Sequence, residues 1–352
     1  MQGNQLPFFN PDHWSLTQSI AVFAGCAFVI AVTGTWITYV VDQLADRTGA
    51  GEAVAGAVFL GGATSLAGSV LSVTAAWKGH PELAVSNALG GIAVQTLFLA
   101  VADFCYRRAN LEHAAASAPN MLQTALLISL LALILLAPLL PDVTFFAIHP
   151  ITPLLLGFYF YGIRLVRGAR LQPMWRPLVT RETRQDIPQK SSLLSSMSSL
   201  WLRFILLLVI LGMTGWLLEP AANNIAIKTG LSETAVGVLL TAVSTSIPEL
   251  VTSIAAVRSG ALTLAVGGIL GGNVFDTLFT AASDIAYRQG SIYHVMPKAS
   301  ILWVTLTLLM SGVLMMGLIR REEQGIAKIG TESAAIIVLY GIGVIVMLTG
   351  GV

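Results

Sequence analysis

The chain has 352 residues, of which 55% are hydrophobic and 11% charged, and its formal net charge is +1. An ordinary globular domain carries about 25% charged residues. The shortage here extends along the whole sequence, which excludes a soluble protein with a single membrane anchor. A net charge of +1 gives no reason to expect a nucleic acid partner. The composition therefore predicts an all-α polytopic membrane protein.

Apolar stretches of about 20 residues, long enough to cross a bilayer, recur almost from end to end. The first fourteen residues contain no basic segment and no small-residue cleavage site, so we expect no removable signal peptide. Cys26 and Cys105 fall within apolar stretches and are expected to be small core residues. We expect about ten membrane-spanning helices, at residues 18–41, 52–77, 83–106, 121–140, 147–166, 200–222, 233–257, 262–286, 299–319 and 332–351.

The basic residues predict the orientation of these spans. Residues 164–203 contain eight Lys and Arg residues, and such residues concentrate on the cytoplasmic side of membrane proteins. With ten alternating spans, fifteen basic residues fall on that side and four on the other. We therefore expect an integral protein of the plasma (inner) membrane with both termini outside and a cytoplasmic basic linker at residues 167–199.

A shift of 181 residues reveals an internal repeat. Residues 64–107 align with residues 245–288 without a gap, and 19 of the 44 positions are identical. With ten spans, the first copy ends inside and the second outside, so the copies are inverted. Many secondary transporters are built from inverted repeats and bind ions where the repeats meet. The prediction is two inverted five-helix repeats, residues 1–166 and 200–352.

The segment STSIPELVTS, residues 244–253, places a carboxylate inside an apolar span. Pro248 cannot donate a backbone hydrogen bond and frees the carbonyl of Ser244. Such a carbonyl is tolerated at membrane depth only where it faces protein, water or an ion. Glu249 shares a helical face with Thr245, four residues earlier. Because intramembrane acids are costly, Glu249 indicates a functional site.

The next span, GGILGGNVFDTLF, supplies a second acid. Gly268, Gly272 and Asp276 are spaced four residues apart, and a face of small residues lets two helix backbones approach closely. This packing would bring Asp276 toward Glu249, and Asn273 adds an amide oxygen. Hard oxygen ligands suit Na⁺ or Ca²⁺ rather than a soft metal. Together with the break at the Pro-Glu pair, this grouping favours ion binding over a structural role for the acids.

Other polar residues have simpler interpretations. Asp103 and Asp284 lie at span ends, four residues before Arg107 and Arg288, and a surface ion pair is expected for each. The histidines lie near loops or on the outer side and are expected to be solvated rather than to act as ligands.

The stretches STSIPELVTS and GGNVFDTLF resemble the two signature helices of the Ca²⁺/cation antiporter superfamily, which includes the sodium/calcium exchangers. In that family each half carries a TS-x-PE helix followed by a GN…GS-x-x-x-N/D helix. The resemblance implies a fold of two inverted halves around a central ion site. It implies that oxygen ligands come from Thr245, Ser246, Glu249 and Asp276, with Thr64 and Ser65 as the matching hydroxyl pair of the first half.

The first half departs from the family pattern. The family's proline and glutamate become Ala67 and Gly68, and its asparagine becomes Gln95. Both carboxylates, Glu249 and Asp276, therefore come from the second half, which leaves the transported ion and the stoichiometry open. The complete expected site comprises Glu249, Asp276, Thr245, Ser246, Asn273, Thr64, Ser65 and Gln95.

The leading interpretation is a secondary active antiporter that exchanges Ca²⁺ or another cation for Na⁺ or H⁺ by alternating access, with spans one and six sliding against the rest. Its partners would be these ions, bound transiently, and the lipid bilayer, with no cofactor. The alternatives are a proton-coupled carrier of altered substrate and a diverged membrane protein that does not transport. An intramembrane enzyme is disfavoured because the sequence shows no paired metal-ligand histidines and no serine elbow.

Overall fold

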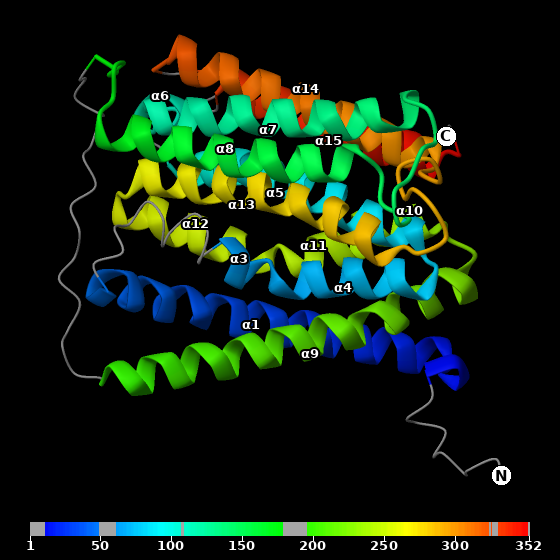
Figure 1. The fold of residues 1–352 in the computed structure, drawn as a ribbon. Coiled ribbons are helices and arrows are strands. Elements are labelled where there is room, and N and C mark those ends of the chain that lie inside the picture. Colours follow the sequence, from blue (N-terminus) through cyan, green and yellow to red (C-terminus); the bar gives the residue numbers. More distant parts are fainter. Residues whose placement is uncertain are drawn as a thin grey trace.

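The computed structural model describes residues 11–48, 61–106, 109–178, 196–323, 325 and 330–350. The helices lie side by side across one bundle (Figure 1). Eight long helices make up most of it: α1 (Leu16–Thr48), α5 (Pro81–Cys105), α7 (Ala118–Leu136), α8 (Ile151–Leu171), α9 (Met197–Thr229), α13 (Leu262–Ala286), α14 (Lys298–Arg320) and α15 (Thr331–Leu348). The shorter helices are α3 (Gly61–Thr64), α4 (Leu66–Lys78), α6 (Leu111–Ala114), α10 (Glu233–Val236), a π-helical turn η5 (Gly237–Thr241), α11 (Ala242–Thr245) and α12 (Ile247–Ser259).

Seven of the described helices are long and apolar enough to cross a membrane. The series from α10 to α12, bent by 45° at its break, raises the number to eight if it counts as one span. The all-helical polytopic class is confirmed, while the count of ten stays a prediction. Part of the predicted span 52–77 lies outside the described residues. α8 fails the same test, since it carries Arg164, Arg167 and Arg170 and continues past the predicted span end at 166.

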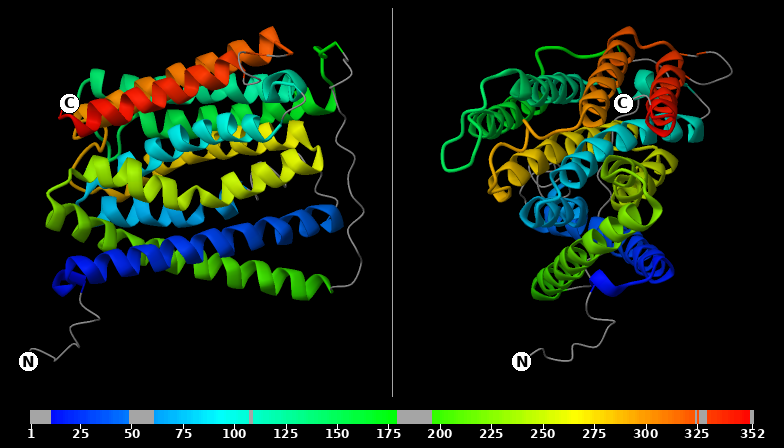
Figure 2. Two further views of the ribbon diagram at one scale, coloured as in Figure 1. Left: turned by 180° about the vertical axis from the view of Figure 1, so that it is seen from behind. Right: turned by 90° about the vertical axis from the view of Figure 1, so that its right-hand side faces the viewer.

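The helices repeat at the interval found in the sequence. α1 and α9, α4 and α12, and α5 and α13 each begin and end at positions 181 residues apart. In Figure 1, α1 and α4 run in opposite directions to α9 and α12, and Figure 2 shows α1 and α9 lying together on one side of the bundle. The repeat in sequence is therefore an inverted repeat in space.

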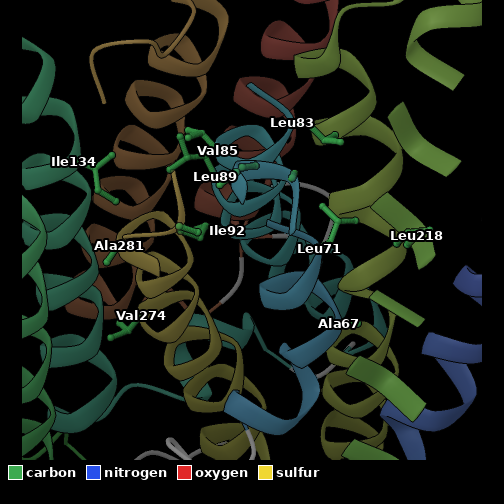
Figure 3. Packing of buried hydrophobic residues seen from close by; sticks show 14 of the residues in the cluster. Ala67, Leu71, Leu83, Val85, Leu89, Ile92, Ile134, Leu218, Val274 and Ala281 are labelled. Carbon is green, nitrogen blue, oxygen red and sulfur yellow. The ribbon is translucent and has the colours of Figure 1, made fainter. Parts of the chain in front are cut away.

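The two central helices of the bundle are α5 and α13. In their most apolar windows 78% and 67% of the residues are buried, against 28% for α1 and α9. Figure 3 shows apolar side chains packed among α4, α5, α7, α9 and α13, including Leu71, Ile92 and Leu218. In a lipid environment such van der Waals contacts, rather than exclusion of water, drive helix association.

Glycines bring α1 and α9 close to the broken helices. A Cβ atom on Gly34 of α1 would collide with the ring of Pro248, and a Cβ on Gly215 of α9 would collide with the carbonyl oxygen of Ala67. These contacts are related by the repeat, because 34 + 181 = 215 and 67 + 181 = 248. α1 therefore rests on α12, and α9 rests on α4, next to the point where each of these helices begins.

The predicted surface ion pairs of Asp103 and Asp284 are wrong. Both carboxylates are buried, and each accepts two backbone N–H groups. Arg288 donates to the carbonyl of Ile285 instead (3.4 Å), and Arg107 lies outside the described residues. The donors are Leu111 (2.7 Å) and Gly330 (3.0 Å) for Asp103, and Ile292 (3.1 Å) and His149 (2.9 Å) for Asp284.

Three smaller expectations also change. His113 and His149 are buried rather than solvated, because the loops that carry them fold back against the bundle. His113 Nδ1 lies 2.6 Å from the carbonyl oxygen of Arg321. Cys26 is buried as expected, whereas Cys105, at the last position of α5, is exposed, and both are free thiols.

Replacing Gly215 by leucine should destabilise the protein by about 1–3 kcal/mol, because the added side chain overpacks the contact with the backbone of Ala67. Thermal unfolding of the purified protein in detergent measures the effect. Gly25→Leu is the matched control, since nothing lies within 4 Å of a Cβ at that glycine. Equal melting temperatures for the two variants would contradict the close approach of α9 and α4.

Candidate ion site

Both repeats contain a helix that breaks and restarts in the middle of the bundle. Ser65 (φ −83°, ψ 4°) separates α3 from α4, and Ser246 (φ −99°, ψ 2°) separates α11 from α12. Pro248 occupies the first turn of α12, where its missing N–H is no loss. The equivalent position of α4 is Ala67, so the first break forms without a proline.

Glu249 lies in the first turn of α12 and faces the break of the other repeat. Its side chain is 6% exposed, and its Oε1 lies 3.5 Å from the hydroxyl of Ser65. The hydroxyl of Thr64 is a second hydrogen-bond partner of this carboxylate. Its Oε2 is buried and has no hydrogen-bond partner. The only carboxylate of this helix thus points at first-repeat hydroxyls.

Asp276, in the middle of α13, meets α5 at the matching position. Its Oδ2 accepts a hydrogen bond from Gln95 Nε2 at 2.6 Å, and Ser65 is a further partner. Gln95 Nε2 also lies 3.4 Å from the hydroxyl of Ser246. Because 95 + 181 = 276, Gln95 and Asp276 are equivalent in the two repeats, and their contact lies where the repeats meet. Ser65 is shared by both acids.

A small cavity of about 10 Å³ lies at this junction. Its apolar and small-residue wall comprises Gly68, Gly91 and Phe279. A Cβ on Gly91 would lie 3.7 Å from Asp276 Oδ2, so the glycine leaves the carboxylate open to the cavity. The polar wall consists of Ser65, Asn87, Gln95, Thr245, Ser246 and Asp276.

Four buried oxygen atoms of these residues and of Glu249 have no hydrogen-bond partner. They are Asn87 Oδ1, Gln95 Oε1, Glu249 Oε2 and Asp276 Oδ1. Leaving a buried acceptor unsatisfied costs about 1–3 kcal/mol, more for a charged group, so such atoms are uncommon. A hard cation such as Na⁺ or Ca²⁺ would satisfy all four, because it binds carboxylate and amide oxygens.

The structure brings together most of the residues expected from the sequence. Glu249 and Asp276 meet the hydroxyls of Ser65, Thr64 and Ser246, and Gln95 contacts Asp276 directly. Thr245 lines the cavity, although its hydroxyl donates to the carbonyl of Thr241 at 2.9 Å.

Asn273 and Asn87 differ from the expectation. Asn273 does not line the cavity, and its Nδ2 donates to Thr96 at 3.0 Å. Asn87 lines it, and its Nδ2 donates to the carbonyl of Gly68 (3.1 Å) and the hydroxyl of Ser72 (2.9 Å). The amide orientation leaves Oδ1 free. The signal for Asn87 was available, since it holds the asparagine position of the family's GN element.

The site differs from a resident metal centre. Among the described residues, no three His, Cys, Asp or Glu side chains lie close enough to hold a metal ion together. Two acids, several hydroxyls and two amides make a binding site of limited charge. Such a site suits an ion that must also be released.

A family model describing the sodium/calcium exchanger protein matches residues 18–164 and 199–349. The chain is 26% identical over 263 residues to CaxA of Alkalimonas amylolytica, a provisionally assigned antiporter, covering 75% of this chain and 78% of that protein. It is 27% identical over 253 residues to the inner membrane protein YrbG of Escherichia coli K12, covering 69% of this chain and 74% of YrbG.

Two solved structures show the same fold. The H⁺/Ca²⁺ exchanger CAX superposes with a TM-score of 0.69 at 13% identity, covering 94% of this chain and 87% of CAX. The sodium-calcium exchanger NCX_Mj superposes with a TM-score of 0.58 at 18% identity, covering 94% and 99%. At these identities the likeness concerns the fold alone. The family match, in contrast, covers both repeats, and the protein therefore belongs to the sodium/calcium exchanger protein family.

Proposed function

We propose that this protein is a secondary active antiporter that exchanges Ca²⁺ or another cation for Na⁺ or H⁺ by alternating access. The observation that carries this proposal is the set of four unsatisfied buried oxygens at the junction of two inverted, broken helices. The cations are bound transiently as cargo, so no resident cofactor is needed. No bond is made or broken, and no catalytic residue is proposed.

The relatives support the same class of function. CAX is an H⁺/Ca²⁺ exchanger, and NCX_Mj is a sodium-calcium exchanger. YrbG is an inner membrane protein, which supports a plasma (inner) membrane location for this chain. We propose repeats at residues 1–166 and 200–352, with the linker 167–199 on the cytoplasmic side and both termini outside.

Each residue of the site has a distinct role in this proposal. Glu249 and Asp276 supply the negative charge, and Ser65 connects them. Gln95 holds Asp276 through its amide N–H and offers its own oxygen to the cation. Two carboxylates match the charge of one Ca²⁺ or of two monovalent cations. The remaining proposed ligands are the oxygens of Thr64, Thr245, Ser246, Asn87 and Asn273.

Alternating access can use the pair α1 and α9. These helices rest on α12 and α4 through the contacts of Gly34 and Gly215, beside the two breaks. Sliding of the pair would cover the site from one side and then from the other. The pair of Lys78 with Glu219 joins α4 to α9 at one end of the bundle, and would have to rearrange in this motion.

A proton-coupled carrier of altered substrate is the second candidate. It is favoured by the loss of the first repeat's acid at Gly68, which reduces the charge available to a divalent ion. In this function Glu249 and Asp276 would exchange protons for the cargo, since each keeps one oxygen without a donor.

Glu249→Gln and Asp276→Asn should each reduce ion-driven flux by roughly tenfold or more. Each change removes a charge from a buried site at nearly constant shape, and 1.4 kcal/mol corresponds to a factor of ten. Flux is measured in proteoliposomes with Na⁺, Ca²⁺ and pH gradients imposed in turn. The exposed Glu323→Gln serves as the control and should transport normally. Full activity in both site variants would place the ion elsewhere.

Gly68→Glu should shift the ion preference toward divalent cations, because an added carboxylate favours a doubly charged ion. A Cβ at Gly68 would lie 3.2 Å from Phe279 Cε2 and 3.5 Å from Thr245 Oγ1, so the new side chain needs room. The variant is therefore also made with Phe279→Ala. Competition of Ca²⁺ with Na⁺ is measured in both backgrounds. Unchanged preference in the folded double variant would show that position 68 does not contribute to binding.

Cysteines introduced into a cysteine-free background should label from opposite sides. Ser198, in the first turn of α9, should react only from the cytoplasmic side, and Gln289, after α13, only from the outside, since both side chains are exposed. Oriented vesicles and a membrane-impermeant maleimide make the measurement. Labelling of both positions from one side would overturn the proposed topology.

A further inference from the structure

Asp103 and Glu112 form a buried acidic pair at one end of the bundle, away from the central site. Asp103 is 1% exposed in the last turns of α5, and Glu112 is 4% exposed on α6. α6 lies at the end of the bundle where α8 ends and α9 begins (Figure 1). The antiport proposal uses neither residue.

The two carboxylates converge on one point. A Cβ built on Gly330 would lie 3.0 Å from Glu112 Oε2 and 3.5 Å from Asp103 Oδ2. Glu112 Oε1 accepts a hydrogen bond from the hydroxyl of Ser333 at 2.9 Å, but Glu112 Oε2 has no partner. An unpartnered, fully buried carboxylate oxygen is therefore directed at a second carboxylate.

The neighbouring charges do not neutralise this pair. Glu332 of α15 adds a third acid, while Arg320 of α14 lies 3.9 Å from Glu332 and 3.2 Å from Glu322. The acids of α13 lie elsewhere, in the central site and at the opposite end. Next to Glu112, His113 faces the carbonyl of Arg321. Among the described residues, no cation contacts Asp103 or Glu112.

The second repeat shows that the fold does not require this acid. Tyr293 occupies the position equivalent to Glu112, and Thr152 that of Ser333, because 112 + 181 = 293 and 152 + 181 = 333. There the hydroxyl of Thr152 donates to Asp284 at 2.6 Å and lies 2.9 Å from that of Tyr293. A neutral phenol thus completes the equivalent network, and the extra carboxylate is specific to the first repeat.

We propose that Asp103 and Glu112 form a proton-binding site, separate from the central ion site, in which one proton bridges the two carboxylates. A proton on Glu112 Oε2 turns the unpartnered acceptor into a donor toward Asp103 and removes one of two like charges. Burial, and then the charge of Asp103, raise the pKa of Glu112 from 4.5 to about 7.

The site joins parts of the chain that are distant in sequence. Asn110 N donates to the carbonyl of Glu323 at 3.0 Å, and Asn110 Nδ2 donates to that of Glu322 at 2.9 Å. Gly330 and Ser333 bind the two acids from the start of α15. Loss of the proton leaves two buried charges facing each other, which weakens the attachment of α6 to α15. The pH on this face of the membrane thereby acts on the packing of this corner.

Infrared difference spectroscopy of the full-length protein in detergent tests the site. The background carries Glu249→Gln and Asp276→Asn, so that the central acids do not contribute. We expect the carbonyl band of a protonated carboxylic acid to disappear with a midpoint near pH 7, and Glu112→Gln to lack it. The exposed Glu323→Gln is the control and should keep it. Identical spectra with and without Glu112 would overturn the proposal.

Two neighbours should move this midpoint in opposite directions. Asp103→Asn removes the like charge and should lower the midpoint by roughly one unit or more, whereas Ser333→Ala removes a donor to the ionised form and should raise it. A midpoint that neither variant shifts would contradict the pair. A midpoint that Ca²⁺ or Na⁺ lowers, in a manner that requires Glu112, would assign the site to a metal cation and overturn its assignment to a proton.

Thermal unfolding gives an independent measurement. Since the folded protein holds this proton to a higher pH than the unfolded chain, the free energy of unfolding should fall as pH rises from about 4.5 to about 7, and then level off. Glu112→Gln should remove this part of the pH dependence and melt higher than the wild type at pH 8. A wild-type slope that persists in the variant would count against the site.

Discussion

The meeting of two broken helices inside the bundle is the constraint on which the rest of the arrangement depends. A break exposes backbone groups and invites polar side chains, and the bilayer supplies no water to satisfy them. Here the breaks at Ser65 and Ser246 face each other across α5 and α13, and Gln95 of one repeat contacts Asp276 of the other. Each repeat thus provides the polar surroundings that the other needs.

The shared scaffold carries different chemistry in its two halves. Helix ends, glycine contacts and buried aspartates recur at the same interval, whereas the charges do not. Glu249 faces Gly68 in the alignment, Asp276 faces Gln95, and Glu112 faces Tyr293. Backbone geometry therefore tolerates the loss of charge at equivalent positions, and the acids can differ between repeats according to what each one binds.

Much of this arrangement was predictable from the sequence. The shift of 181 residues, the opposite direction of the repeats and the approach of Glu249 and Asp276 all follow from motif and hydropathy patterns. The break before Ala67 was not, because no proline marks it. Spacing misled at Asp103 and Asp284, since an arginine four residues away was visible while their true donors, such as Gly330 for Asp103, are far along the chain. Asn87 was left out because its helix shows no acid.

The contact of Gln95 with Asp276 has a consequence for the history of the fold. These residues hold the same position in the two repeats, so the contact joins a position to its own counterpart. In an ancestor with a single repeat, the same residue would have touched its own copy across a twofold axis in the membrane plane. Such an ancestor could build this site only as a homodimer of chains inserted in opposite orientations. Fusion of the two copies then allowed one side of the axis to become an amide while the other stayed an acid.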